Sequence, residues 1–472
     1  MHAFKKNIAG LIAFAFLSGL IGPPAATGIT IKEEEDLARE FLRYVTLQLE
    51  IIDDPIIVDY VNSVGKRILA KLPPQPFPYH FYVVNQEVYN AFATPAGHVF
   101  IYSGLIAAMD NEDELAGILA HEISHVTCRH ISQKIERSKL INIATLAGIA
   151  AGILIGAAGG GEAAGALTMG SMAAGQSASL AYSRENEIQA DQVGMVYLTE
   201  AGYTGEGLVS VLNKIRAKQW YGSDQVPTYL MTHPALEDRM AYIDTYLASR
   251  KKELQASRPV NTKAFQLAHA RLIALYSDEK VALSTFEAAL RSETADAITY
   301  YGYGLALARA GKNEQAVTAL KKALETEAFN PIFLAGLGRV YFLDRRYQEA
   351  LTTIASALSL DPQEPEALFF LGRTRLELDQ PAEAQAAFER LQKQEIVSKQ
   401  VYYFLGKAYG QEGKLAEAYL NLGRYYYLKH DYTNARIHFK QALEKTQDPD
   451  QRREIEGRLK EIKKILKALK ES

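Results

Sequence analysis

Two histidines with a glutamate between them form the pattern in this sequence that is best suited to chemistry. They are His121 and His125, with Glu122, in the stretch HEISH. Residues four apart share one face of a helix, so both imidazoles can bind a single zinc ion. Glu122 lies beside that face and can take a proton from a water that the metal acidifies, as in peptide-bond hydrolysis. The motif therefore predicts a catalytic zinc site with Glu122 as the general base.

A catalytic zinc needs a third protein ligand, and two places in the sequence offer one. His130 is near, but on a continuing helix it would point about 140° away from His125. Glu187 and Asp191 lie four apart farther along, and Ala190 leaves room for a close helix contact. Glu187 can bind the metal while Asp191 accepts a hydrogen bond from a ligand histidine. Without the HEISH motif, the same polar stretch would indicate only a solvated helix face.

Helices and short strands are expected to position these groups. Amphipathic helices are predicted over 33–51, 55–72 and 110–131, and the last of them carries HEISH with Asp110 or Asn111 as its cap. β-rich runs at 81–84 and 98–102 lie on either side of turn signals around 90–97.

A Gly- and Ala-rich segment, 140–175, follows the HEISH helix. It is compatible with a pair of closely packed helices, with a flap over the site, or with a membrane-contacting stretch. Its first part, Leu140–Ala158, is nearly long enough to span a bilayer. The abundance of glycine lowers helix propensity, so a flap remains one of the three interpretations.

The second half of the chain repeats every 34 residues. Four glycines mark the period, each followed twelve residues later by an alanine: Gly304, Gly338, Gly372 and Gly406, with Ala316, Ala350, Ala384 and Ala418. This spacing resembles the tetratricopeptide repeat and predicts an α-solenoid with a concave binding surface. By analogy with that repeat, six residues are expected to face the groove: Tyr301, Arg339, Phe369, Arg373, Tyr403 and Lys407. The alternative for the aromatic residues among them is packing between helices.

The first 28 residues have the pattern of an export signal. Lys5 and Lys6 precede an uncharged apolar run, and small residues follow near Pro23. An uncleaved anchor is the alternative, but the run is short for a bilayer span. The predicted domains are 1–28 signal peptide, 29–255 zinc metalloprotease domain, 261–446 tetratricopeptide-repeat domain and 447–472 C-terminal capping helix, for which a basic membrane-binding helix is the alternative.

HEISH followed by ENEIQAD at 185–191 resembles the zinc metallopeptidase family that includes the CAAX prenyl endopeptidase and bacterial heat-shock membrane proteases. The stretch 90–105 is similar to the strand region of that family. The export signal and tandem repeats resemble one branch, the periplasmic proteases that enhance β-barrel assembly. The resemblance implies a mainly α (α+β), gluzincin-type domain with a small β-sheet and one zinc ion per chain. It also implies these roles: His121, His125 and Glu187 as ligands, Glu122 as base, and Asp191 as the partner of a ligand.

His233, followed by Pro234 and later by Arg239, also fits the family pattern. Pro234 suits the first turn of a helix, which would place His233 at the mouth of that helix. We expect His233 to approach the zinc or the oxyanion, and Arg239 to support substrate or structure. If His233 closed the fourth metal position, the resting enzyme would be latent. A helix-capping histidine is the simpler interpretation.

These features predict a periplasmic zinc endopeptidase that cleaves misfolded or misassembled outer-membrane proteins captured with help from the repeats. A substrate added as a strand beside 98–102 would be bound with broad specificity. The expected partners are such substrates and the outer-membrane assembly machinery, with peripheral membrane contact through Leu140–Ala158. A net charge of −3 gives no field that would attract nucleic acid. A repeat-based chaperone or scaffold with latent protease activity is one alternative, and a membrane-attached processing peptidase is another.

Overall fold

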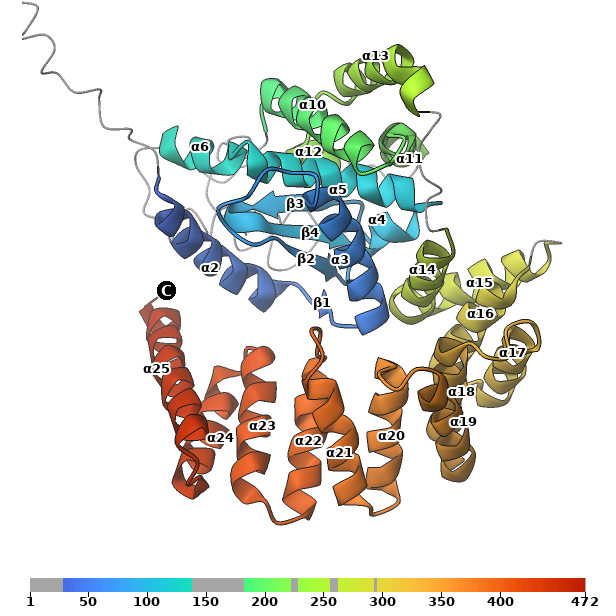
Figure 1. The fold of residues 1–472 in the computed structure, drawn as a ribbon. Coiled ribbons are helices and arrows are strands. Elements are labelled where there is room, and N and C mark those ends of the chain that lie inside the picture. The colour runs from blue at the N-terminus through green and yellow to red at the C-terminus, as the bar shows by residue number, and fades with distance from the viewer. Residues whose placement is uncertain (1–28, 138–181, 222–227, 255–261, 293–294, 472) are drawn as a thin grey trace, which may run out of the picture.

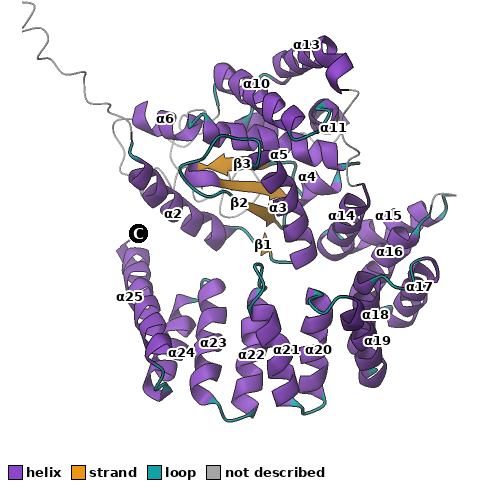
Figure 2. Cartoon of the chain, viewed as in Figure 1, coloured by secondary structure: helices purple, strands orange, loops and turns teal. Residues whose placement is uncertain are grey.

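The fold is given by a computed structural model (Figure 1). It describes residues 29–137, 182–221, 228–254, 262–292 and 295–471. The predicted export signal and the Gly- and Ala-rich segment lie outside these described residues. Within them, strands occur only in the N-terminal half and helices make up most of the rest (Figure 2). This confirms the predicted fold class, a mainly α domain with a small sheet followed by helical repeats. None of the described helices is both long and apolar enough to cross a membrane.

A four-stranded sheet forms the centre of the N-terminal domain. Its strands run in the order β1-β2-β4-β3: β1 (Ile51–Ile52), β2 (His80–Val84), β4 (His98–Tyr102) and β3 (Ala91–Thr94). Strands β2 and β4 are parallel, while β1 and β3 are antiparallel edge strands. Strand β3 corrects the prediction of a turn across 90–97. Its residues are all buried, and the turn is limited to Pro95–Gly97, where Ala96 has a φ of 57°.

Side chains of the sheet alternate between two cores, because successive strand residues point to opposite faces. Phe100 and Tyr102 pack with residues of helix α2 (Ile31–Gln48) on one face. Val99 and Ile101 enter the main core on the other face. Helices α3 (Pro55–Leu69) and α5 (Glu112–Thr127) contribute to the same core, so the HEISH helix packs against this face of the sheet.

Helix α5 is shorter than the sequence predicts. Asn111 caps its start by accepting a hydrogen bond from the Glu114 N–H, and the helix ends at Thr127. Arg129 then adopts a φ of 54°, and its guanidinium donates to Glu34 at 2.7 Å. A new helix, α6 (His130–Arg137), begins after this turn. The single helix predicted over 110–131 is therefore wrong, and this changes where His130 lies.

Helix α10 packs closely on α5, because Gly194 faces it. A Cβ atom at Gly194 would lie 3.2 Å from the carbonyl oxygen of Ala120. The approach brings the start of α10 to the histidine face of α5. The remaining helices of this domain are α4 (Ser103–Ala107), α10 (Arg184–Glu200), α11 (Glu206–Tyr221), α12 (Thr228–Thr232) and α13 (Leu236–Leu254).

The repeats form helical hairpins in which the periodic glycines lie where two helices cross. A Cβ atom at Gly338 would lie 2.6 Å from Ile354 Cγ1, and the same contact recurs between Gly304 and Leu320. The helices are α14 (Thr262–Tyr276), α15 (Glu279–Leu290), α16 (Ala297–Arg309), α17 (Asn313–Thr326), α18 (Pro331–Leu343), α19 (Tyr347–Leu360), α20 (Pro365–Glu377), α21 (Pro381–Gln392), α22 (Lys399–Gln411), α23 (Leu415–Leu428), α24 (Tyr432–Lys445) and α25 (Pro449–Glu471).

The repeat array curves beneath the N-terminal domain and contacts it at its start, middle and end (Figure 1). At the start, α14 packs on α3 and α4. In the middle, the Ser398 hydroxyl donates to Asp53 at 2.9 Å, just before α22. At the end, Leu47 of α2 packs against the cluster formed by α24 and α25. The concave side of the repeats is thus partly occupied by the chain's own protease-like domain.

This arrangement alters the expected groove. Tyr301 is fully buried, stacks on Phe333, and accepts a hydrogen bond from Arg271, so its predicted place in an open groove is wrong. Tyr403 and Lys407 are exposed. The other three predicted groove residues line a cavity that the N-terminal domain helps to close: Arg339, Phe369 and Arg373.

Helix α14 belongs to both halves of the molecule. Phe265 and Leu272 are part of the core of the N-terminal domain. Ala270 and Ile273, on the same helix, are part of the core of the first repeats. The first helix of the array is therefore also a structural helix of the domain before it.

Candidate metal centre

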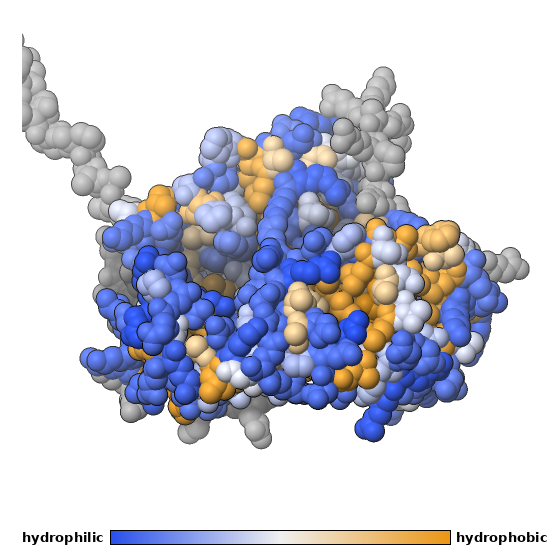
Figure 3. Space-filling model, turned by 60° about the horizontal axis from the view of Figure 1, so that its bottom comes forward, coloured by the Kyte–Doolittle hydropathy of each residue, from blue (hydrophilic) through white to orange (hydrophobic). Residues whose placement is uncertain are grey.

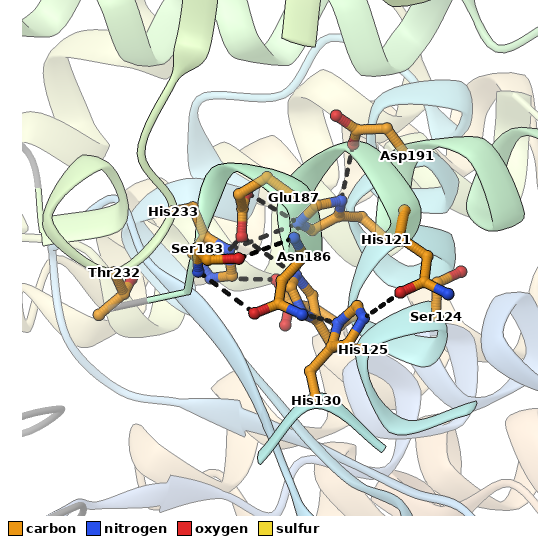
Figure 4. Close-up of polar contacts among 12 residues, drawn as sticks. His121, Ser124, His125, His130, Ser183, Asn186, Glu187, Asp191, Thr232 and His233 are labelled. Atoms are coloured by element: carbon orange, nitrogen blue, oxygen red, sulfur yellow. Dashed lines mark hydrogen bonds and ion pairs between the residues drawn. The ribbon is translucent and has the colours of Figure 1, made fainter. Parts of the chain in front are cut away.

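Four potential metal ligands converge although they come from three separate segments. One ligand atom from each lies within 4.8 Å of the others, and all four side chains are buried (Figure 4). His121 and His125 extend from α5, Glu187 from the first turn of α10, and His233 from the residue after α12. Three imidazoles and a carboxylate are a donor set that zinc accepts.

The distances within this cluster suit a single small ion. His125 Nε2 lies 3.0 Å from His121 Nε2 and 3.3 Å from Glu187 Oε1. His233 Nδ1 lies 3.1 Å from Glu187 Oε1 and 3.4 Å from His121 Nε2. Tetrahedral ligands at roughly 2.0–2.1 Å from zinc are about 3.3 Å from one another. The residues present therefore fit a zinc ion.

Asp191 fixes the orientation of His121. Its Oδ1 lies 2.8 Å from His121 Nδ1, and Arg239 donates to both of its oxygens at 2.8 and 2.9 Å. Burial acts to raise the pKa of Asp191, but the charges of Arg239 and His121 hold it at about 2. The ionised carboxylate accepts the Nδ1–H hydrogen bond and leaves Nε2 as the free ligand atom.

Arg239 also acts on Glu187. Its Nη1 lies 2.8 Å from Glu187 Oε2, and the guanidinium is fully buried. Burial opposes ionisation of Glu187, yet the charges of His233 and Arg239 hold the pKa of this carboxyl well below its usual range. Glu187 is therefore anionic, as metal binding requires. Of the two roles expected for Arg239, the contacts favour structural support of the site.

Glu122 stands apart from the other acids of the site. It is fully buried, and neither carboxylate oxygen has a hydrogen-bond partner among the described residues. The imidazole of His233 is close to it, with Nε2 at 3.6 Å from Glu122 Oε1. Burial raises the pKa of Glu122. A buried acceptor without a partner is rare in proteins, so this carboxylate is placed to receive a proton from a further group.

His130 contacts a ligand histidine. Its Nδ1 lies 2.9 Å from His125 Nδ1, and its Nε2 lies 3.0 Å from Gln189 Oε1. The predicted direction, about 140° away from His125, assumed a continuing helix. The left-handed turn at Arg129 ends that helix and brings the ring back. No glycine or proline marks this turn in the sequence.

Two tyrosines cover the cluster. Tyr182 stacks on His125 with ring centroids 3.7 Å apart, and Tyr229 stacks on His233 at 4.3 Å. Both are buried, so they exclude water from one side of the imidazoles. The sequence analysis missed both. Tyr229 lies four residues before His233, a spacing that could have indicated it, whereas Tyr182 belongs to no recognisable motif.

His233 reaches the cluster from a position that differs from the prediction. Its backbone N–H donates to the Tyr229 carbonyl at 2.8 Å and closes α12. The next helix begins only at Leu236, so Pro234 is not in its first turn. The side chain of His233 caps no helix and instead contacts Glu187.

The expected substrate strand is also corrected. Strand β4 pairs with β2 on one side and with β3 on the other, so 98–102 has no free edge. The edge on that side is β3 (Ala91–Thr94), which lies against α5. Any polypeptide added to this side of the sheet would have to pair with β3.

Comparison with known proteins supports a peptidase assignment. Residues 58–247 match peptidase family M48, and residues 280–331, 304–365, 341–395 and 416–445 match tetratricopeptide repeats. The β-barrel assembly-enhancing protease of Escherichia coli (strain K12) is 28% identical over 298 residues, covering 60% of this chain and 59% of that protein. The protein of the same name from Yersinia pestis is 30% identical over 275 residues, covering 58% and 55%.

A mitochondrial relative matches a shorter part of this chain. The mitochondrial metalloendopeptidase OMA1 of Schizosaccharomyces pombe is 26% identical over 198 residues, covering 42% of this chain and 55% of that protein. The chain spans less than two thirds of the length of each of these relatives. The region that matches family M48, residues 58–247, contains the whole histidine, glutamate and arginine cluster described above. Residues 58–247 are therefore a metallopeptidase domain of family M48, and tetratricopeptide repeats follow it in this chain.

Proposed function

We propose that this chain is a zinc-dependent endopeptidase of the cell envelope that cleaves misfolded or misassembled outer-membrane proteins. One observation carries the enzymatic part: four ligand atoms lie within 4.8 Å of one another beside the unpartnered carboxylate of Glu122. The name of the relatives, β-barrel assembly-enhancing protease, supports the substrate class. The repeats support capture of polypeptide, since repeat arrays offer extended binding surfaces.

In the proposed mechanism, His121, His125 and Glu187 hold the zinc ion. When bound, zinc supplies Lewis acidity that polarises a peptide carbonyl and acidifies water. Glu122 takes a proton from the attacking water and returns it to the nitrogen of the leaving amine. Its two oxygens are available for this because no described residue hydrogen-bonds to them. Asp191 keeps His121 in the tautomer that presents Nε2.

Hydrolysis is tested by substitutions within the cluster. Glu122→Gln should retain one zinc per chain and lose casein cleavage by about 10²-fold or more. Glu187→Ala should lose the zinc itself, measured by mass spectrometry of the metal. Glu185→Ala is a matched control, because Glu185 lies on the same helical turn but is exposed. Full zinc content in the Glu187 variant, or cleavage by the Glu122 variant, would contradict the proposal.

A second candidate function is a chaperone or scaffold whose protease is latent. The observation that favours it is the contact of His233 with Glu187 and His121, which offers a fourth donor to the metal. A fourth protein ligand would leave no open position for chemistry. His233→Ala should then raise casein cleavage, whereas a fall would indicate that His233 stabilises the transition state. Unchanged cleavage would exclude both roles.

Export and membrane contact are parts of the proposal that rest on residues outside the described ranges, namely 1–28 and Leu140–Ala158. Cell fractionation tests them. We expect the processed chain in the periplasmic fraction, and a chain that stays with the membrane after a high-salt wash would instead favour an anchored processing peptidase.

The surface of the repeats is consistent with binding of unfolded polypeptide. Hydrophilic residues cover much of the face in Figure 3, and hydrophobic residues gather on its right side, where Figure 1 places the first repeats. Phe329, between α17 and α18, is 82% exposed. Exposed apolar surface of this kind commonly marks an interaction site.

A further inference from the structure

A cavity of about 320 Å³ lies between the N-terminal domain and the repeats. Its walls come from the start of α3, from α14, α18 and α20, and from residues 396–401 at the start of α22. The volume falls at the lower end of the range of ligand pockets, about 300–1,000 Å³. Both domains therefore contribute to one partly open cavity.

One part of the cavity wall is a closed ionic network. Arg271 donates to Asp54 at 2.8 and 2.9 Å and to Glu366 at 2.8 and 3.0 Å. Arg339 donates to Glu366 at 3.0 Å. The acids here are already paired with guanidinium groups. This part of the wall holds the two domains together and has no unmet charge for a ligand.

Arg373, on the same cavity wall, is different. Its guanidinium carbon lies 4.4 Å from the ring centroid of Phe342 and 4.9 Å from that of Phe404, with Phe369 and Phe370 next to them. The described residues offer it no hydrogen bond or ion pair, and its Nε is buried without a partner. Burial lowers the pKa of Arg373, and the charge of Glu377 on the same helix opposes this shift in part. The rings lie beside the guanidinium, and its Nε–H is a buried donor without an acceptor among the described residues.

The wall near α20, α21 and α22 has an apolar part, beside which Asp53, Ser398 and Gln400 also line the cavity. Four residues form the apolar part: Phe369, Leu391, Val397 and Val401. A ligand that fits must therefore combine an anion with an apolar group. A guanidinium recognises a planar carboxylate best, because two parallel N–H donors match its two oxygens.

We propose that this cavity binds the carboxyl-terminal end of a polypeptide whose last residue is apolar. Only a terminal residue carries a carboxylate and a side chain on the same Cα atom. It can therefore place the carboxylate on Arg373 and its side chain against Phe369 and Val401 together. The inference deepens the proposed function, since it rests on the repeats capturing polypeptide, and it names the end by which they do so.

The test measures binding to the full-length chain carrying Glu122→Gln, which prevents digestion of the probe. The probe is a fluorescein-labelled peptide, Gly-Ser-Gly-Ser-Leu-Phe, followed by fluorescence anisotropy. The free acid should bind at least about tenfold more tightly than the C-terminal amide, as expected for one lost charge-assisted hydrogen-bond pair. Equal binding of acid and amide would overturn the proposal.

Substitutions locate the binding. Arg373→Ala should weaken binding of the free acid about tenfold and abolish the difference from the amide, and Arg373→Lys should have an intermediate effect. Gln400→Glu adds a negative charge to the cavity wall without changing the size of the side chain, so it should also weaken binding of the free acid. Arg375→Ala is the matched control, because Arg375 lies on the same helix but outside the cavity lining and hydrogen-bonds Gln380. Circular dichroism checks that each variant is folded.

Two further outcomes separate this inference from its rivals. An amidated peptide with an internal glutamate that binds as tightly as the free acid would overturn the assignment to a chain end and indicate an acidic side chain instead. If no peptide binds while the wild-type chain cleaves casein and its Glu122 variant does not, the cavity inference fails and the proposed peptidase stands.

Discussion

Replacing Arg271 with methionine should weaken the junction between the two domains. Its side chain, only 4% exposed, donates hydrogen bonds to Asp54 of the N-terminal domain, Glu366 of the repeats and the hydroxyl of Tyr301. Methionine has a similar length without the charge, so Arg271→Met removes these bonds and leaves little new empty space. The cost then reports mainly the loss of ionic pairing.

The expected loss follows from the burial of the acids that remain. The side chains of Asp54 and Glu366 are each 6% exposed. Removing one partner of a buried ion pair costs about 3–5 kcal/mol, because the other charge stays buried and unpaired. Glu366 keeps its bond to Arg339, so most of the cost falls on Asp54. The free energy of unfolding should therefore fall by about 3 kcal/mol.

Urea unfolding of the full-length chain at pH 7, followed by far-ultraviolet circular dichroism, measures this loss. Arg453→Met is the control, because Arg453 and its partner Asp450 are 81% and 85% exposed and such pairs contribute little. Adding Asp54→Asn to the Arg271 variant should recover part of the loss by removing the unpaired charge. A loss below about 1 kcal/mol would refute the reasoning from burial.

The same network predicts a dependence on pH. Burial acts to raise the pKa of Glu366, but Arg271 and Arg339 lower it from its ordinary value of 4.5 to about 2. A carboxyl group whose pKa is lowered by folding stabilises the protein above its unfolded pKa and loses this effect as pH falls toward its folded pKa. The difference in stability between wild type and Arg271→Met should narrow between about pH 4.5 and pH 2. A constant difference would contradict this.

Other variants test separate parts of the structure. Burial raises the pKa of Glu364 to about 8, so Glu364→Gln should gain stability over wild type as pH rises from about 5 to 8, and urea curves that show no such trend would contradict it. In the same assay, Gly338→Ala should lower the free energy of unfolding by about 1–3 kcal/mol, because its Cβ would clash with Ile354. Gly457→Ala is the control: its Cβ meets nothing within 4 Å, so the free energy of unfolding should rise by up to about 1 kcal/mol. Arg239→Leu leaves two buried acids without their cation, so both the melting temperature and the zinc content should fall.

Regular spacing explains what the sequence could predict. The two histidines of HEISH, and the pair Glu187 and Asp191, lie four apart, and that spacing alone places each pair on one helix face. The structure then shows both faces meeting. The 34-residue glycine period likewise predicted the repeats, because close helix crossings exclude a side chain at Gly338 and its equivalents.

What the sequence could not predict depends on contacts between distant segments. The positive φ of Arg129 is held by an ion pair with Glu34, far along the chain, and no local residue type signals it. Strand β3 forms in a stretch rich in turn signals because its side chains are buried between α5 and α2. Tyr301 was expected in an open groove because the repeat register gives the face of a helix but not what covers that face.

The sharing of α14 has a consequence for how such chains could be recombined. A peptidase domain truncated before Thr262 would lose Phe265 and Leu272 from its core and expose the apolar residues they cover to water. A foreign repeat array fused at that point would have to supply the same two side chains. Repeat arrays should therefore be exchanged at a fusion point after Tyr276, so that the first repeat helix, α14, stays with the peptidase domain.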